Sequence, residues 1–132
     1  MNVEIAGPAV PHLTRRDIIG FVRKVMLAVE REFDEISIAL VNDRTVRGLN
    51  RKFRGKNRST DVLTFPGDDS CEIVISLDQA RRQAAAEGHS LPTEIRYLLL
   101  HGILHGLGYD HEKDEGQMNA LELRVREAVG LD

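Results

Sequence analysis

The sequence contains a single cysteine, Cys71, so the chain cannot form an intramolecular disulfide. It contains no apolar run near the roughly 20 residues that a membrane-spanning helix requires. Its first residues do not combine the basic patch and the apolar run of a secretory signal. Together these absences predict a cytoplasmic protein without membrane attachment, because reduced thiols are typical of the cytosol.

No repeats, low-complexity segments or linkers rich in Pro, Gly or Ser interrupt the 132 residues. At this length, and with 42% hydrophobic residues, one compact domain can bury roughly two-thirds of the surface that the unfolded chain exposes. We therefore expect a single domain over residues 1–132.

Basic charge is concentrated in one part of the chain, although the net charge is −3. Residues 44–58 contain no acidic residue and seven basic ones, which are Arg44, Arg47, Arg51, Lys52, Arg54, Lys56 and Arg58. Such a local excess favours binding to a polyanion. A basic helix face and loop that contact only solvent would give the same pattern, so charge alone leaves both interpretations open.

The hydrophobic pattern predicts short helices and strands that alternate along the chain. Strands are expected at residues 2–6, 36–41, 61–65 and 71–76. Helices are expected from Thr14 to about Glu32, in a shorter segment capped by Asp43, at 78–87, from Pro92 through Leu107, and at 115–129. These elements predict an α+β fold in which a small mixed sheet of about four strands packs with helices.

Three of the five histidines lie within HGILHGLGYDH, residues 101–111. His101 and His105 are four positions apart in a mostly apolar helical pattern, so their side chains lie about one turn apart on one face. Gly108 can adopt the left-handed conformation that ends a helix, and the resulting turn can bring His111 back towards the other two. The spacing therefore predicts that three imidazoles converge on one point.

Three imidazole ligands are typical of a catalytic zinc site. Zn²⁺ prefers tetrahedral coordination, so three protein ligands leave a fourth position for water. Zinc lowers the pKa of that water to about 7, which provides a nucleophile at neutral pH. Because burying three polar rings without a shared partner would be costly, we predict that His101, His105 and His111 bind one Zn²⁺ ion.

The histidine spacing also matches the zinc-peptidase signature H-E-x-x-H-x-x-G-x-x-H at every position except one. Gly102 stands where the peptidases carry the glutamate that acts as general base. Peptide hydrolysis would need a base from elsewhere, for which Glu94 and Glu112 are candidates. A zinc metallopeptidase or amidase therefore remains an alternative.

The histidine segment and the upstream segment LNRKFRGKNRSTDVLTFP, residues 49–66, together resemble the YbeY family of bacterial endoribonucleases. The family pattern has leucine-asparagine, an aromatic residue, Arg-Gly-Lys, Thr-Asp or Thr-Asn, Val-Leu, and Ser or Thr before Phe-Pro. The matching residues here are Leu49, Asn50, Phe53, Arg54, Gly55, Lys56, Thr60, Asp61, Val62, Leu63, Thr64, Phe65 and Pro66. The order of elements resembles the family over essentially the whole chain, although these two segments carry nearly all of the specificity.

The resemblance implies a zincin-like metallohydrolase architecture in which His101, His105 and His111 bind one Zn²⁺ ion. It implies an endoribonuclease specific for single-stranded RNA, acting in maturation of the 3′ end of small-subunit ribosomal RNA and in ribosome quality control. The functionally important arginine of the family corresponds to Arg54, which we therefore expect to be catalytic. The implied partners are ribosomal RNA and the small ribosomal subunit.

The mechanism that we expect assigns the water or a phosphate oxygen to zinc and the charge that develops at phosphorus to Arg54. A guanidinium suits this role because it donates two parallel hydrogen bonds to phosphate and keeps its charge. The other expected RNA contacts, which position phosphates without reading bases, are Arg51, Lys52, Lys56 and Arg58. Binding should then weaken steeply with salt. A non-catalytic ribosome-assembly factor would use the same basic surface and remains a second alternative.

Several other polar residues have roles that the sequence leaves open. Asp110 could orient a ligand ring or cap the turn that follows it. Thr60 and Asp61 could order the loop before their strand or approach the phosphate. His12 and His89 lie in polar contexts, so we expect both on the solvated surface.

The sequence departs from the family pattern in two places. Cys71 and Glu72 stand where Gly-Asp is usual, and Ser59 stands where proline is common. We therefore assign no role to Glu72. Cys71 lies in an apolar strand without a basic neighbour, so we expect a small core residue rather than a nucleophile.

Overall fold

Four strands and five helices form along residues 1–110 and 112–131, which are the residues that the computed structural model describes. The strands are β1 (Asn2–Ala6), β2 (Glu35–Val41), β3 (Val62–Pro66) and β4 (Ser70–Ser76). The helices are α1 (Arg15–Val29), α2 (Asp43–Arg54), α3 (Leu77–Glu87), α4 (Leu91–Gly106) and α5 (Gln117–Val129). Each element overlaps one that the hydrophobic pattern predicts.

The four strands form one mixed sheet in the order β1-β2-β4-β3. β1, β2 and β4 are parallel, with Ile36 opposite both Val3 and Cys71, whereas β3 is antiparallel to β4. β3 is therefore an edge strand whose outer backbone groups can bond to other parts of the chain. The α+β prediction with a small mixed sheet is confirmed.

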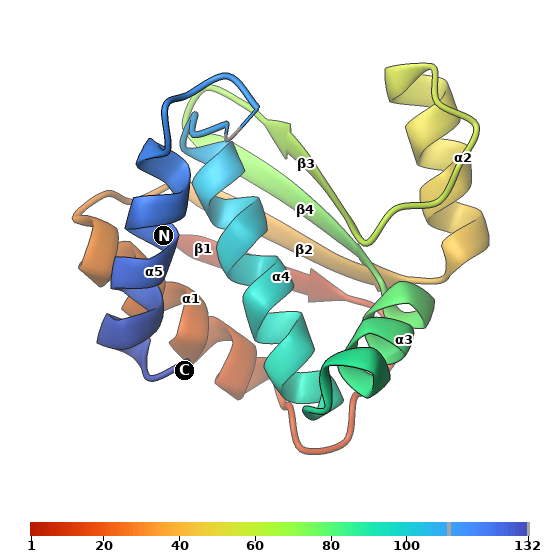
Figure 1. Ribbon diagram of the computed structural model, residues 1–132, viewed down its shortest axis with the longest axis horizontal. Helices are drawn as coiled ribbons and strands as arrows, with labels where there is room; N and C mark the ends of the chain where they lie inside the picture. Colours follow the sequence, from red (N-terminus) through yellow and green to blue (C-terminus); the bar gives the residue numbers. More distant parts are fainter. Residues whose placement is uncertain (111, 132) are drawn as a thin grey trace.

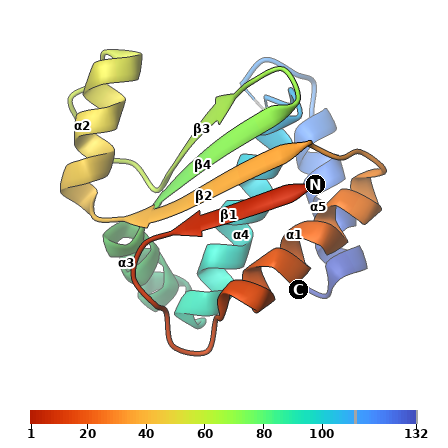
Figure 2. The ribbon, with the colours of Figure 1, turned by 180° about the vertical axis from the view of Figure 1, so that it is seen from behind.

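The helices α1, α4 and α5 lie on one side of the sheet, with α4 crossing its middle (Figures 1 and 2). Alternate strand residues point to this side, so Ile36, Ile38 and Ile73 are fully buried beneath α4. α4 is buried on most sides, as its apolar pattern predicts, and its buried residues include Ile95, Leu98, Leu99, Leu100, Ile103 and Leu104. No helix among the described residues is long and apolar enough to cross a bilayer.

On the other side of the sheet, α2 covers one end (Figure 2). Val46 of α2 packs against Leu63 and Val74 to form a small second core, with Leu49 and Phe65 at its margin. α2 stands near the free edge of β3 (Figure 1), and side chains of its last turn contact this edge. This position sets where the basic segment lies relative to the sheet.

Two predicted helix boundaries are wrong at the level of single residues. Thr14 caps α1 with a capping box as expected, but α1 ends at Val29, where Glu30 turns into the left-handed conformation with φ 56°. The residue that caps α2 is Asn42, whose side chain accepts from the backbone N–H of Thr45. Asp43 is therefore the first helical residue and not the cap.

Candidate functional site

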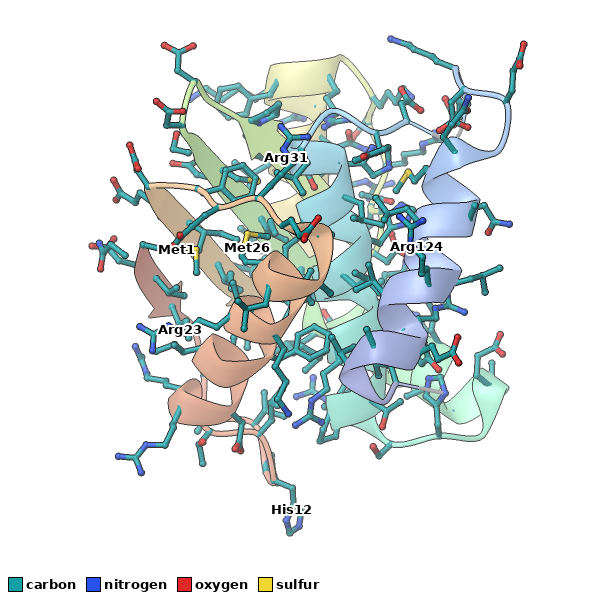
Figure 3. All side chains as sticks on the ribbon, turned by 90° about the vertical axis from the view of Figure 1, so that its left-hand side faces the viewer. Met1, His12, Arg23, Met26, Arg31 and Arg124 are labelled. Carbon is teal, nitrogen blue, oxygen red and sulfur yellow. The ribbon has the colours of Figure 1, made fainter. Side chains whose placement is uncertain are left out.

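Two of the three predicted metal ligands, His101 and His105, lie in the C-terminal half of α4. The helix ends as predicted, because Gly108 has a φ of +102° and its N–H donates to the carbonyl of His105 at 3.0 Å. Arg31, which Figure 3 places near this end, donates to the carbonyl of Leu107 at 3.2 Å. These bonds satisfy carbonyl groups that a helix end leaves unpaired, and they fix the turn that follows His105.

His101 and His105 point their Nε2 atoms towards each other. The two nitrogens are 3.2 Å apart, the ring centroids are 4.7 Å apart, and the ring planes lie at 71°. Two ligand nitrogens at zinc-bond length in a tetrahedral site are separated by about 3.3 Å. The spacing of these two nitrogens therefore fits a shared divalent ion.

Glu122 of α5 lies against the other nitrogen of the His101 ring. Its Oε1 is 3.4 Å from His101 Nδ1, and its Oε2 accepts from Arg126 at 3.3 Å. A carboxylate at Nδ1 favours the tautomer that keeps the proton there, which leaves the lone pair on Nε2 for a metal. No local pattern in the sequence indicates this contact, because Glu122 follows His101 by 21 positions in another helix.

His111, the third predicted ligand, lies outside the described residues. Within residues 1–110 and 112–131, no group of three or more His, Cys, Asp or Glu side chains could hold a metal ion. The structure thus brings together His101 and His105, while the three-histidine site stays a prediction.

Arg54, the predicted catalytic residue, is the last residue of α2 and its side chain is exposed. Its guanidinium donates to the outer carbonyl of Thr64 on β3 at 2.8 Å. The Thr64 hydroxyl in turn donates to the carbonyl of Gly102 at 3.4 Å, next to His101. The edge strand β3 therefore connects the arginine of α2 to the histidine turn of α4.

The other predicted RNA contacts all lie at the surface of the same segment. Arg51 and Lys52 belong to the last turn of α2, and Lys56 and Arg58 follow it in the loop; all four are exposed. The buried Asn50 organises this loop, because its amide donates to the carbonyl of Arg58 at 2.9 Å. One buried amide thus holds the surface loop that carries Lys56 and Arg58.

Close packing explains why Gly102 replaces the peptidase glutamate. A Cβ atom at Gly102 would lie 3.0 Å from Cγ2 of Ile73 and 3.3 Å from the Thr64 hydroxyl. A glutamate would meet the sheet at this position. Gly102 lets α4 approach β3 and β4 closely, and this approach brings β3 beside the histidines.

The candidate base Glu94 lies far from the histidine pair and contacts another residue. It is buried in the first turn of α4, at the opposite end from His105, and its Oε1 lies 2.5 Å from His89 Nε2. His89 is half-buried and stacks on Tyr97 with ring centroids 5.4 Å apart. The prediction of a solvated His89 is therefore wrong, whereas His12 projects into solvent as expected (Figure 3). Glu112, the other candidate, is exposed.

The structure favours ordering roles for the residues that the sequence left open. Asp61 accepts from the backbone N–H of Val62 at 2.8 Å and from Gln83 at 3.2 Å, with the Thr60 hydroxyl 3.4 Å away. Asp110 accepts from the backbone N–H of Glu112 at 3.0 Å, which caps the following turn.

Cys71 is a core residue, as predicted. Its side chain is buried between the sheet and the helices. Burial raises the pKa of the thiol to about 12, with the nearby carboxylate of Glu72 adding to the shift. A thiol in this state is a poor nucleophile.

The profile of the protein family described as Endoribonuclease YbeY matches residues 11–130. The chain belongs to this family. It is 44% identical over 123 residues to an Endoribonuclease YbeY of Solibacter usitatus, covering 90% of this chain and 82% of that relative. It is 45% identical over 102 residues to the one of Nautilia profundicola, covering 74% of this chain and 73% of that relative.

Another relative, the Endoribonuclease YbeY of Koribacter versatilis, is 44% identical over 100 residues, covering 74% of this chain and 66% of that relative. The chain thus spans about two thirds to four fifths of the length of these relatives. The fold resembles the solution structure of TM1509 from Thermotoga maritima, with a TM-score of 0.65, 27% identity, and coverage of 97% of this chain and 89% of that chain. Family membership supports an endoribonuclease role, and with it RNA as the substrate class.

Proposed function

We propose that this protein is a zinc-dependent endoribonuclease that cleaves single-stranded RNA. The observation that carries the proposal is the pair of Nε2 atoms of His101 and His105, 3.2 Å apart, beside a strand edge that holds Arg54. The family match supports the RNA part of the proposal. The metal part rests on the histidine geometry and on the spacing of the sequence.

His101, His105 and His111 are the residues that would hold the ion. Zn²⁺ bound there would supply Lewis-acid activation of the phosphodiester and of the attacking group. Glu122 orients the ring of His101 through Nδ1, and Arg126 holds Glu122 from the other side. This chain of contacts would orient the His101 ring as a ligand for the ion.

In this proposal Arg54 would bind the phosphate at the point of cleavage. Its bond to the Thr64 carbonyl uses one of the five N–H groups of a guanidinium, and the exposed side chain leaves donors for a phosphate. Anchoring to a strand edge reduces the freedom that the side chain would otherwise lose on binding. Arg54 would stabilise the negative charge that develops in the transition state.

As part of the same proposal, the substrate is ribosomal RNA near the 3′ end of the small subunit, in maturation and quality control of ribosomes. The exposed basic residues of α2 and its loop support a large polyanionic partner. The single buried cysteine suits the reducing cytoplasm, where this substrate is made.

Metal analysis and RNA cleavage together test the proposal. Purified wild-type protein should contain about one zinc per chain and cut single-stranded RNA. His105→Ala should lose both zinc and cleavage. Arg54→Ala should keep zinc but lose about 100- to 1,000-fold in kcat, the range for removing one donor to transition-state charge.

Two exposed residues provide matched controls. His12→Ala removes a solvent-exposed histidine, and Arg23→Ala removes an exposed arginine of α1; neither should change zinc content or cleavage. Equal cleavage by wild type and His105→Ala would identify a contaminating nuclease and contradict the proposal. Zinc without any turnover would favour the assembly-factor alternative, and His105-dependent release of peptides would favour the peptidase.

A further inference from the structure

Phe53 is an apolar side chain that the fold leaves in water. Its exposed fraction is 58%, and the only other large hydrophobic residues exposed in the described part of the chain are Leu27 and Leu123. The chain has only four phenylalanines and no tryptophan. An exposed ring in the last turn of α2, among the basic residues of that turn, therefore calls for an explanation.

The ring of Phe53 is held in place by its neighbours. It packs edge-to-face with Phe65 of β3, with centroids 5.5 Å apart and planes at 70°. Lys52 Nζ lies 5.2 Å from the Phe53 centroid, and the Arg54 guanidinium carbon lies 5.8 Å from the Phe65 centroid. The two rings thus pack against each other between two cations, over the end of α2 and the edge of β3.

This combination matches the physics of binding to unpaired nucleic acid. Proteins that bind single strands combine basic side chains for phosphates with aromatic rings on which bases stack. Stacking needs an exposed base face, which a duplex does not offer. We propose that Phe53, supported by Phe65, is a stacking site for one unpaired base of the substrate, while Lys52 and Arg54 bind the adjacent phosphates.

This inference rests on the proposed RNA substrate and adds a reason for single-strand specificity. Arg54 belongs both to this surface and to the contact chain that leads through Thr64 to Gly102. A base stacked on Phe53 would therefore position the neighbouring phosphate at Arg54. A strand that lacks a free base would lose this alignment.

The surrounding charge favours RNA over other occupants of the same surface. Five exposed cations lie within five positions of Phe53, which are Arg51, Lys52, Arg54, Lys56 and Arg58. A second copy of the chain would bring the same cations into contact and repel. If Phe53 served only to cover Phe65, an aliphatic side chain of similar size would serve equally well, and this difference can be measured.

Binding to short RNAs distinguishes a Phe53 that stacks on a base from a Phe53 that only covers Phe65. The chain carrying His105→Ala, which should prevent turnover, is titrated with a single-stranded RNA that contains 2-aminopurine and with an abasic RNA of equal charge. Phe53→Leu should weaken binding of the first RNA about 10-fold and leave the abasic RNA unchanged. Phe53→Tyr should restore the affinity and the quenching of 2-aminopurine that stacking causes.

The control variant is Leu27→Ala, which removes an exposed apolar side chain of α1 and should change neither affinity. Thermal unfolding of each variant checks that the fold is intact. Equal affinity of Phe53→Leu and the parent for the base-containing RNA, or an equal loss for both RNAs, would overturn the stacking site. If the parent binds no RNA at all, the proposed function fails and this site fails with it.

Discussion

Glu122 is the residue that most extends the candidate metal site beyond its histidines. Its carboxylate lies between His101 Nδ1, at 3.4 Å, and the guanidinium of Arg126, at 3.3 Å. Arg126 is itself placed over the ring of Tyr97, 4.7 Å from the centroid. The orientation of one proposed ligand thus depends on side chains from α5 packed against α4.

Replacing Glu122 by glutamine should weaken zinc binding without leaving a cavity. The amide has the same shape but loses the charge that favours a proton on Nδ1, so the metal-binding nitrogen becomes less basic. We expect zinc affinity to fall about 10- to 100-fold. Competition with a chromogenic chelator measures this affinity directly, independently of RNA cleavage.

Glu127→Gln is the matched control, because Glu127 is an exposed glutamate of the same helix. It should bind zinc with wild-type affinity. If Glu122→Gln and Glu127→Gln have the same zinc affinity, Glu122 does not position the ligand.

At the scale of the element, α4 depends on glycines where it crosses the sheet. A Cβ atom at Gly106 would lie 2.5 Å from Sγ of Cys71 and 3.2 Å from the ring of Phe33. At Gly20, within α1, an added Cβ atom would have no neighbouring heavy atom within 4 Å outside its own stretch of helix. Replacing each glycine by alanine therefore distinguishes two effects. At Gly20 only the helix preference of alanine changes stability, whereas at Gly106 the added methyl group also crowds its neighbours.

Gly106→Ala should destabilise the protein although alanine favours helices. The gain in helix propensity is about 1 kcal/mol, and overpacking against Cys71 costs about 1–3 kcal/mol. Gly20→Ala should instead stabilise, by up to about 1 kcal/mol. Urea unfolding of the variants measures these changes.

Replacing Cys71 by alanine tests whether its sulfur atom causes the destabilisation expected for Gly106→Ala. In the double variant Gly106→Ala with Cys71→Ala, the two effects should be non-additive by about 1 kcal/mol in the favourable direction. Strictly additive changes would show that the contact between position 106 and Cys71 does not limit the approach of α4.

The elements themselves could be predicted from the sequence because their signals are local. Alternation placed β2, and the apolar pattern with Pro92 placed α4. The cap of α2 could not be chosen this way, because Asn42 and Asp43 are both good capping residues. Asp43 forms bonds to β4 and α3 instead, and those partners are distant in the sequence.

The candidate site was predicted only as far as its local spacing extends. The i, i+4 spacing of His101 and His105 predicts adjacent rings, and the structure confirms it. The pairing of His89 with Glu94 was missed because a polar loop context says nothing about burial. Glu122 and the exposure of Phe53 depend on how α5 and α2 pack, which a one-dimensional pattern does not contain.

At the scale of the whole molecule, Asp43 connects four segments of the chain. Its carboxylate accepts from Ser76 at the end of β4, at 2.6 Å, and from Ser59 in the basic loop, at 2.9 Å. It also accepts from Arg82 of α3. The loop that carries the basic residues is therefore tied to the sheet and to α3 through one carboxylate at the start of α2.

This network predicts how stability depends on pH. The hydrogen bond from Ser76, then those from Arg82 and Ser59, hold the pKa of Asp43 below its ordinary value of 3.8. The charged form therefore stabilises the fold at every pH above about 3.8, and this contribution is lost as the pH falls through the lower pKa of the folded state. Asp43→Asn should thus be less stable than wild type at pH 6, and the difference should narrow below about pH 4.

Urea midpoints of wild type and Asp43→Asn, measured from pH 6 down to about pH 2.5, test this dependence. Asp68→Asn, in the exposed turn between β3 and β4, should match wild type at neutral pH. A gap between wild type and Asp43→Asn that stays constant over the whole range would mean that the charge of Asp43 does not stabilise the fold. A narrowing gap would show that the charged carboxylate of Asp43 stabilises the fold and that acid removes this contribution.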